Sequence, residues 1–445
     1  EIPLRLVGSE MCIRDRLKAV VGINWGDEGK GRIVDLMSAK ANYVVRYQGG
    51  NNAGHTVVTQ EGKYVLNLLP SGILHPDVVC VLGNGMVIDL DHLRHEISIM
   101  QQMNVKITPD NLKISDKATI CMPMHVRQDV LEEERLSQSG SAYGSTRRGI
   151  AYAYGDKYMK KTLRIGDLLN IDQPSVRHRL SVIVESKNLI LENIYHQSPV
   201  SYDELLEWCK TQAHMFKDYI CDTSALLRNA AKDKKNILFE AQLGALRDID
   251  YGIYPYTSSS NTLAAYIPMG TGLMGYNVSQ VVGVMKAYST CVGEGGFVAE
   301  KAMPESWMEE LRKAGGEYGA ATGRPRRVGP FDAVASRYGI MCQNVDDIAL
   351  TKLDVLSDFD TIPIITAYSI DGTITKDFVT DSRLEKAEPV IEELPGWKCD
   401  ISGCRSWDEL PENAKNYILK LEELISHKIH LVSTGAEREE YLLRD

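Results

Sequence analysis

The chain has 445 residues, a formal net charge of −10 and 44% hydrophobic residues. This composition is typical of a soluble globular protein, and nothing in it approaches the roughly 18 consecutive apolar residues of a membrane span. The acidic balance argues against a nucleic-acid partner, so any polyanion site must be local, which favours a nucleotide or metabolite. Nine cysteines without a C-x-x-C pair are typical of reduced thiols. We therefore expect a cytoplasmic protein without membrane or nucleic-acid partners.

The first residues, 1–16, differ from the rest of the chain. They read EIPLRLVGSEMCIRDR and have neither the apolar region of a signal peptide nor the acid-poor amphipathic pattern of a transit peptide. We interpret them as a non-native or disordered extension. No linker divides residues 17–445, so we expect them to form one large domain.

The sequence is organised around Leu17–Arg32, which reads LKAVVGINWGDEGKGR. Its apolar start predicts a buried parallel strand, and the amphipathic residues after it suit a helix packed on the sheet. Gly26, Gly29 and Gly31 lie between them, where backbone N–H groups and a helix N-terminus can approach a phosphate, and Lys30 adds a positive charge. The spacing is not that of a P-loop, so a tight turn with a solvated lysine remains the alternative.

Two carboxylates, Asp27 and Glu28, stand within this loop. They would repel a phosphate unless one of them holds a metal ion or takes a proton. A second polar loop, Gln48–Thr56, follows the strand predicted at residues 41–47 and contains His55, which can donate a proton near neutral pH. Open parallel sheets bind ligands at the carboxyl ends of their strands, which favours a functional histidine over an ordinary loop residue.

Three later segments offer groups to an anion. Residues 137–154 read as a loop with hydroxyl and guanidinium groups, and residues 257–262 are rich in hydroxyl groups. Residues 319–329 place three arginines in a loop of Gly and Pro, and guanidinium groups suit bidentate binding of carboxylate or phosphate. For residues 137–154 an ordinary mobile loop is the alternative.

Between these segments the pattern predicts helices and a strand. Residues 167–235 are amphipathic and read as a helical layer over the sheet. Residues 236–240 resume the strand pattern, and Ala241–Gly244 reads as the start of a loop.

Two patterns resemble sites but favour ordinary structure. Gly270–Gly275 matches G-x-G-x-x-G, yet strand-like residues follow it where a dinucleotide-binding fold needs a helix. His92, His95 and Glu96 could share one face of a helix as metal ligands, but no further ligand signature accompanies them.

Residues 351–354, TKLD, end a predicted strand with a lysine and an aspartate. An aspartate there can accept hydrogen bonds from N1–H and the 2-amino group of guanine, while the lysine stem packs along the base, so guanine is distinguished from adenine. A salt bridge at the strand end is the alternative. Leu431–Gly435 predicts a strand and a turn that could close over the base or ribose.

Five motifs together closely resemble the adenylosuccinate synthetase family, in order along residues 18–445. They are NWGDEGKG at 24–31, GGNNAGHT at 49–56, TGR at 322–324, TKLD at 351–354 and STG at 433–435. The resemblance implies an α/β fold with a large, mostly parallel central sheet flanked by helices, a P-loop-like GTP site, and helical and small sub-regions in one large domain.

The resemblance also implies a reaction. The family joins L-aspartate to IMP with GTP, giving adenylosuccinate, GDP and phosphate through 6-phosphoryl-IMP, in the committed step from IMP to AMP. One Mg²⁺ per site, held by Asp27 and Gly54, and a homodimer with shared active sites are implied as well. Asp27 would be the base, His55 the acid, and Lys30 a third catalytic residue.

Residue by residue, the resemblance implies three binding sets. The GTP set is Gly26, Asp27, Glu28, Gly29, Lys30, Gly31, Arg32, Gly54, His55, Thr56, Arg326, Lys352, Leu353, Asp354, Ser433, Thr434 and Gly435. The IMP set is Asp27, Glu28, Gly29, Lys30, Asn52, Ala53, Gly54, His55, Thr146, Lys160, Gln242, Ser258 and Arg324. The aspartate set is Ala320, Ala321, Thr322, Gly323, Arg324, Pro325 and Arg326.

The IMP set departs from the family pattern. Lys160 stands where the partner subunit usually lends an arginine, which keeps the charge but loses the bidentate grip. Leu243 stands where the family has a glutamine, leaving Gln242 one place earlier, and Ser258 replaces a threonine. Cys291 stands where arginine is common, and residues 145–152 depart from the usual TTGRGIGP.

The alternative function is a GTP-binding regulatory protein that has lost IMP chemistry. A protein that only binds GTP needs neither an acid nor a base, so the joint presence of Asp27 and His55 favours the enzyme. A P-loop kinase or GTPase is disfavoured because no hydroxyl residue follows Lys30.

Overall fold

The computed structural model describes residues 16–52, 54–59, 61–318 and 325–444. Residues 1–15 of the extension expected at residues 1–16, and the site residues expected at Ala53 and 320–324, therefore lie outside the described residues. Every helix in the described ranges is too short or too polar to cross a membrane.

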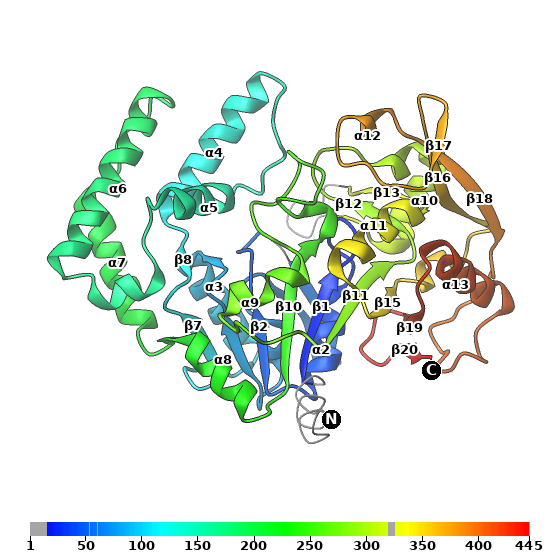
Figure 1. Cartoon of the computed structure of the whole chain (residues 1–445), viewed down its shortest axis with the longest axis horizontal. Helices are drawn as coiled ribbons and strands as arrows, with labels where there is room; N and C mark the ends of the chain where they lie inside the picture. The colour runs from blue at the N-terminus through cyan, green and yellow to red at the C-terminus, as the bar shows by residue number, and fades with distance from the viewer. Residues whose placement is uncertain (1–15, 53, 60, 319–324, 445) are drawn as a thin grey trace, which may run out of the picture.

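A ten-stranded sheet runs through the centre of the molecule (Figure 1). Across the sheet its strands are β20 (Tyr441–Leu443), β19 (Ile429–Ser433), β15 (Asp347–Thr351), β11 (Gln280–Lys286), β1 (Leu17–Gly22), β10 (Ile237–Gly244), β2 (Tyr43–Arg46), β5 (Val79–Leu82), β7 (Leu112–Ser115) and β9 (Ile220–Cys221). All neighbours pair in parallel except β19 and β20. The mostly parallel central sheet expected from the resemblance is confirmed.

The order of the strands places the first part of the chain in the middle of the sheet. Strand β1 pairs with β10 on one side and β11 on the other, and Ala19, Val20 and Val21 in it are completely buried. Strands that are buried on both faces have continuous apolar sequences. The apolar start of Leu17–Arg32 therefore predicted a buried parallel strand correctly. The carboxyl end of β1 therefore lies at the centre of the edge where parallel sheets bind ligands.

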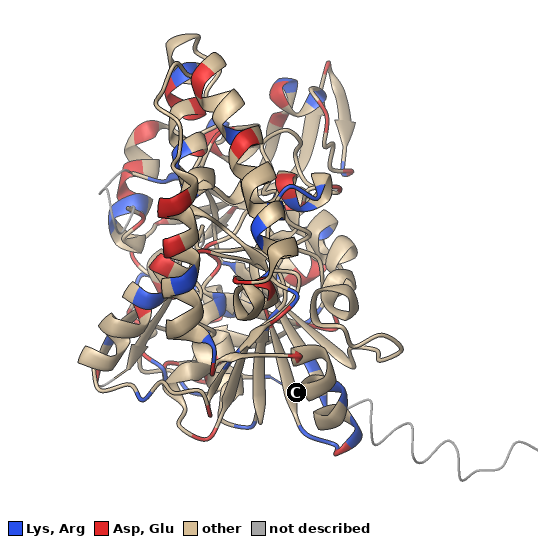
Figure 2. Cartoon of the chain, turned by 90° about the vertical axis from the view of Figure 1, so that its left-hand side faces the viewer, with Lys and Arg blue, Asp and Glu red and all other residues tan. Residues whose placement is uncertain are grey.

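Helices flank the sheet and extend beyond it at one end. Those described are α2 (Lys30–Ser38), α3 (Leu90–Gln102), α4 (Pro123–Gln138), α5 (Ile150–Met159), α6 (Pro174–Asn193), α7 (Tyr202–Phe216), α8 (Thr223–Lys232), α9 (Ile267–Thr271), α10 (Glu305–Gly315), α11 (Ala333–Gln343), α12 (Arg383–Lys386) and α13 (Glu412–Ile425). Figure 1 shows α4, α6 and α7 grouped at one end of the molecule, beyond β7. Figure 2, viewed from that end, shows acidic and basic residues interspersed along the helices.

Smaller sheets complete the fold. They are the hairpin of β3 (His55–Thr59) and β4 (Gly62–Leu66), the pairs β6 (Val87–Ile88) with β8 (Thr119–Ile120) and β12 (Ser289–Cys291) with β13 (Arg327–Gly329), and a sheet of β14 (Phe331–Asp332), β16 (Thr361–Ile370), β17 (Thr373–Thr375) and β18 (Glu388–Pro395). In Figure 1 the sheet that contains β16 lies at the opposite end from α6 and α7. The hairpin and the β12–β13 pair carry residues of the candidate site.

Three expectations about local structure are corrected. The loop expected at residues 137–154 is confined to 139–149, because α4 continues to Gln138 and α5 begins at Ile150. Asp129 of α4 accepts a hydrogen bond from the backbone N–H of Gly149, at 2.8 Å, which fixes the start of α5. Within residues 167–235, α8 packs on the sheet as expected, because its buried residues share a core with β2, β5 and β10, whereas α6 and α7 lie beyond β7 in Figure 1.

The third correction concerns β10, which was expected to end at residue 240. The strand instead continues to Gly244, because its last residue pairs with Gly22 of β1 after an irregularity in the register. The Gly270–Gly275 segment leaves α9 through Gly272, whose φ of +77° ends the helix, and then leads to β11. The prediction that a strand follows it is confirmed.

Candidate active site

The loop between β1 and α2 has the backbone of an anion-binding turn. Gly26 and Gly29 have φ of +107° and +89°, which favours glycine, and α2 begins directly afterwards at Lys30. A Cβ added to Gly31 would stand only 2.8 Å from the Cβ of His55, so the first turn of α2 lies against the β3–β4 hairpin. The free N–H groups of the helix N-terminus can therefore approach a phosphate beside His55.

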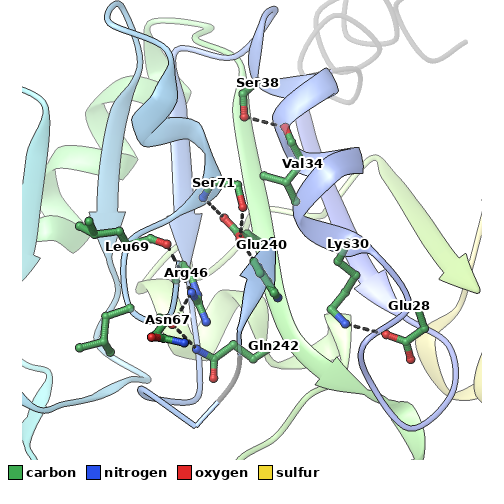
Figure 3. Close-up of polar contacts among 12 residues, drawn as sticks. Glu28, Lys30, Val34, Ser38, Arg46, Asn67, Leu69, Ser71, Glu240 and Gln242 are labelled. Atoms are coloured by element: carbon green, nitrogen blue, oxygen red, sulfur yellow. Dashed lines mark hydrogen bonds and ion pairs between the residues drawn. The ribbon is translucent and has the colours of Figure 1, made fainter. Parts of the chain in front are cut away.

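The two carboxylates of this loop have opposite environments. Glu28 is buried, with one oxygen 2.6 Å from Lys30 Nζ and the other accepting a hydrogen bond from the backbone N–H of Gly26 at 2.8 Å. Figure 3 shows Lys30 reaching back to Glu28 from the start of α2. Asp27 is 28% exposed, and its Oδ2 lies 3.3 Å from Arg326 Nη2. Glu28 thus shapes the loop and orients Lys30, while Asp27 remains accessible to a substrate.

Asp27 and the hairpin offer oxygen atoms to a divalent cation. Mg²⁺ prefers oxygen ligands and is commonly held by one or two carboxylates, several waters and the phosphates of a substrate. The Asp27 carboxylate and the backbone carbonyl of Gly54 are donors of this kind. Within the ranges that the structure describes, no group of three or more His, Cys, Asp or Glu side chains could hold a metal ion. One carboxylate and one backbone carbonyl are oxygen donors that fit Mg²⁺ when a nucleotide and waters supply its other ligands.

His55 is held by a buried carboxylate. Its Nδ1 lies 2.5 Å from Glu240 Oε1, and Glu240 also accepts hydrogen bonds from the backbone N–H and the hydroxyl of Ser71, each at 2.8 Å. Burial lowers the pKa of His55 although the neighbouring Glu240 opposes this shift. His55 Nε2 is buried and has no hydrogen-bond partner among the described residues. When Nδ1 carries a proton toward Glu240, Nε2 is the ring atom that can act on a bound substrate.

A buried arginine balances the charge of this pair. Arg46, at the end of β2, is fully buried and donates from Nη1 to the backbone carbonyl of Asn67 at 2.7 Å (Figure 3). Burial lowers the pKa of Arg46, and the charges of Glu240 and Glu96 oppose that shift. The charge of Arg46 acts to lower the pKa of both carboxylates: that of Glu240 is lowered overall, whereas burial still raises that of Glu96.

Gln242 lies close to the second polar loop but is already engaged. It is fully buried, its Oε1 accepts from the backbone N–H of Gly50 at 3.1 Å, and its Nε2 donates to the Gly50 carbonyl at 2.6 Å. Leu243 follows with φ of +58°, and its backbone lies against Gly26. Gln242 therefore fixes the loop, and its contact with IMP remains a prediction.

The carboxyl ends of β15 and β19 meet the start of α2. Arg32 Nη1 donates to Ser433 Oγ at 2.6 Å and to the Gly435 carbonyl at 2.5 Å. Asp354 Oδ1 is buried without a hydrogen-bond partner among the described residues, and burial raises the pKa of Asp354. Lys352 Nζ donates to the Gly315 carbonyl at 2.6 Å. An acceptor left free in this place suits the donors on the edge of a guanine base.

These contacts join most of the expected GTP and catalytic residues in one place. The residues of the IMP set are less completely assembled: Ser258 donates its backbone N–H to the Arg247 carbonyl at 2.8 Å, and Asn52 Oδ1 accepts from the backbone N–H of Gly50 at 3.3 Å. In the described part of the chain, no hydrogen bond or ion pair connects Thr146 or Lys160 to the loop after β1. Lys160 caps the carboxyl end of α5 and is exposed.

Cys291, which stands where arginine is common in the family, lies beside a buried arginine. Arg247 is 7% exposed, and its Nη2 lies 3.0 Å from Cys291 Sγ while its Nη1 donates to the Glu294 carbonyl at 3.2 Å. A guanidinium group is therefore present beside position 291 although residue 291 is not an arginine. It joins the loop that carries Ser258 to the loop after β12.

The sequence did not predict Arg46, Glu240 or Glu317 as members of the site. In the sequence each of them is a charged residue within or shortly after an apolar strand or helix. Such a residue is rarely buried without a partner, so this pattern could have indicated a site. Glu240 interrupts the apolar run of β10, and Glu317 lies two residues after α10 with no exposed surface. What the sequence could not give was the partner of each charge.

The carboxyl ends of the parallel strands carry a phosphate-type loop with an accessible aspartate, and a buried histidine–glutamate pair lies against it. Asp354 adds a buried carboxylate oxygen without a hydrogen-bond partner among the described residues. This combination is that of a nucleotide-dependent α/β enzyme.

Comparison with known proteins gives the family. The family model described as adenylosuccinate synthetase matches residues 19–442. The adenylosuccinate synthetase of Carboxydothermus hydrogenoformans is 43% identical over 427 residues, which are 96% of this chain and 98% of that protein. The one from Geobacter sulfurreducens is 43% identical over 425 residues, 95% and 97% of the two chains. The structure of fully ligated adenylosuccinate synthetase from Plasmodium falciparum matches with a TM-score of 0.89 and 34% identity, covering 97% of this chain and 100% of that one.

The chain belongs to the adenylosuccinate synthetase family, as its motifs predicted. It is a GTP-dependent ligase that uses Mg²⁺.

Proposed function

We propose that this protein joins L-aspartate to IMP and converts GTP to GDP and phosphate, giving adenylosuccinate through 6-phosphoryl-IMP. The observation that carries the proposal is a pair of groups: an accessible Asp27 carboxylate in the loop after β1, and a buried His55 against the first turn of α2 whose Nε2 has no hydrogen-bond partner among the described residues. A protein that only binds GTP needs neither of them.

In the first step Asp27 takes the N1 proton of IMP, so that O6 attacks the γ-phosphorus of GTP and GDP leaves. In this step His55 carries a proton on both ring nitrogens: Nδ1–H is held by Glu240, whose charge opposes the lowering of the pKa of His55 by burial, and Nε2–H donates a hydrogen bond toward the departing GDP and stabilises its charge. Lys30, oriented by Glu28, places its charge beside the same phosphates. Proton-transfer groups of this kind accelerate reactions by roughly 10² to 10⁴ each.

In the second step the neutral amine of L-aspartate attacks C6 of the phosphorylated purine, phosphate leaves with the electrons of the C6–O6 bond, and the amine nitrogen releases one proton to water. Arg326, which faces Asp27, is the described arginine available to the carboxylates of aspartate. Bound Mg²⁺, with Asp27 and the Gly54 carbonyl as its protein ligands, would neutralise charge on the phosphate oxygens.

The remaining roles follow the same assignment. Asp354 would accept from the guanine edge, Lys352 would pack along the base, and Ser433–Gly435 would close over it. Asn52, Thr146, Gln242 and Ser258 would bind IMP. We further propose a cytoplasmic homodimer without nucleic-acid or membrane partners, in which Lys160 reaches the active site of the partner subunit, and a single catalytic domain at residues 17–445.

The test follows the ultraviolet absorbance of the purine as C6 exchanges oxygen for nitrogen. The purified chain is incubated with IMP, GTP, Mg²⁺ and L-aspartate, and each component is omitted in turn. A spectral change that requires all four supports the ligase. No change, with GTP still bound, would support the GTP-binding regulatory protein instead.

A further inference from the structure

Glu317, which has no role in the mechanism above, lies at the centre of a cluster of charges. It follows α10, directly before the segment that leads to Pro325, and it has no exposed surface. Its Oε1 accepts hydrogen bonds from Lys286 at 2.9 Å, Lys352 at 3.0 Å and the hydroxyl of Tyr288 at 2.6 Å. Its Oε2 accepts from Arg326 Nη1 at 2.7 Å.

The two oxygens of this carboxylate therefore contact residues that we propose to bind two different substrates. Lys352 belongs to the guanine-binding residues proposed for GTP, whereas Arg326 faces Asp27 and belongs to the residues proposed for L-aspartate. The backbone strengthens the second connection, because the N–H of Arg326 donates to the carbonyl of Glu317 at 2.9 Å.

The exposure of the partners distinguishes this cluster from a purely structural one. Lys286 is 3% exposed and also donates to Thr290 Oγ1 at 2.9 Å, so it belongs to the interior. Lys352 is 35% exposed and Arg326 23% exposed, although both contact the same buried carboxylate. Glu317 thus binds Lys352 and Arg326 from the protein interior, and the exposed parts of both side chains remain available to a ligand.

The charges explain why a carboxylate is tolerated there. Burial would raise the pKa of Glu317, but the charges of Lys286 and Lys352 hold it well below its ordinary value. Three cations face Glu317, and Asp27 is a second acid within reach of Arg326. Removing the Glu317 charge would leave the cations to repel one another and Arg326 to pair with Asp27 alone.

We infer that Glu317 is a positioning residue that holds Lys352 and Arg326 on opposite oxygens of one carboxylate and so couples the GTP subsite to the L-aspartate subsite. The inference rests on the proposed function. It makes one distinctive claim: a change on the guanine side alters the binding of aspartate.

The experiment uses the full chain and compares Glu317→Gln with Asp332→Asn. Asp332 is also a fully buried carboxylate, but it accepts from the backbone N–H of Ala335 and from the hydroxyl of Tyr368, away from the cluster. With IMP saturating, we expect Glu317→Gln to raise the KM for GTP and the KM for L-aspartate about tenfold each. Asp332→Asn should lower the melting temperature and leave both KM values within twofold.

The second variant, Lys352→Met, tests the coupling directly. It can be used alone if Glu317→Gln does not fold. At saturating GTP we expect it to raise the KM for L-aspartate about threefold, although Lys352 is not among the aspartate residues. In the double variant the effects on this KM should be less than additive, because both substitutions break the same connection. An aspartate KM that is unchanged in Lys352→Met, or strictly additive effects, would overturn the inference.

Failure of the proposed function gives a different result. If the wild-type chain makes no product, the ligase is wrong, and Glu317 is then judged by equilibrium titration with a fluorescent GTP analogue. If Glu317→Gln binds the GTP analogue tenfold more weakly than Asp332→Asn does, the role of Glu317 at the GTP subsite is supported, but its coupling to the aspartate subsite is rejected. Equal affinities would reject both parts.

Discussion

Adjacent residues in one loop take different roles because their surroundings differ. Glu28 points inward, where Lys30 and two backbone N–H groups satisfy it, while Asp27 turns outward with φ of +59°. An aspartate tolerates this left-handed conformation better than most residues, and it presents the carboxylate to the ligand side of the loop. Sequence alone gave the pair and the need to neutralise it, but not which acid was satisfied internally.

Asp27→Asn is expected to lower kcat by about 10² to 10⁴, because an amide cannot take the N1 proton of IMP. The purine absorbance assay measures the loss, and circular dichroism checks that the variant is folded. Asp381→Asn is a suitable control, since Asp381 is 53% exposed and pairs only locally with Arg383. Turnover retained in Asp27→Asn would show that another group is the base.

His92 provides a prediction about pH. Burial, with a smaller contribution from the charge of Arg148, lowers its pKa from 6.5 to about 4. Between these values the unfolded chain binds a proton that the folded chain does not bind, so the stabilisation is complete above pH 6.5 and is lost as the pH falls toward 4. His92→Gln lacks this titration. Urea unfolding should show that stability falls by about 1 kcal/mol less in the variant than in the wild type between pH 7 and 5. Parallel pH profiles for the two proteins would contradict this account.

At the scale of elements, β10 shows where sequence reasoning succeeds and where it stops. The run at residues 236–240 predicted the strand, but its end at Gly244 depends on pairing with Gly22, which local pattern does not contain. Because alternate residues share one face of a strand, Glu240 and Gln242 both serve the second polar loop. The longer strand therefore explains how Gln242 came to be buried.

Leu243→Gln is expected to raise kcat/KM for IMP about threefold to tenfold. The substitution places an amide beside Gly26, at the position where the family resemblance puts its IMP-contacting glutamine, while Gln242 continues to hold Gly50. Leu243→Met is the matched control, because it keeps an apolar side chain of similar volume. A gain in neither variant would indicate that another group already fills this role.

For the whole molecule, the motifs predicted the fold class and the family, and the strands that carry the site were found with errors of a few residues. The helices α6 and α7 were predicted as helices but misplaced, because amphipathic periodicity shows that a face is buried and not what covers it. The partners of Glu240 and Glu317 come from segments up to about 185 residues away, which explains why they escaped prediction.

The proposed shared active site of the homodimer can be tested by mixing two inactive proteins. We expect Lys160→Ala to lose most activity through weaker IMP binding, and Asp27→Asn to be inactive for the reason given above. If Lys160 acts across the subunit boundary, a subunit exchange between the two variants creates hybrids with one intact site, and about a quarter of the wild-type activity should return. Size-exclusion chromatography confirms the dimer, and mixtures without any recovery would place Lys160 in its own subunit's site.

The position of β1 at the centre of the sheet determines when this strand can pair with its neighbours during synthesis. Leu17 pairs with Ile237, about 220 residues later in the chain, and Arg32 finds its partners Ser433 and Gly435 almost at the end. At about 5 to 20 residues per second, a nascent chain waits roughly 10 to 40 s before its first strand meets a neighbour. The contacts of Arg32 with Ser433 and Gly435 come later still, so the loop after β1 obtains its full set of contacts only after residue 435 has been synthesised.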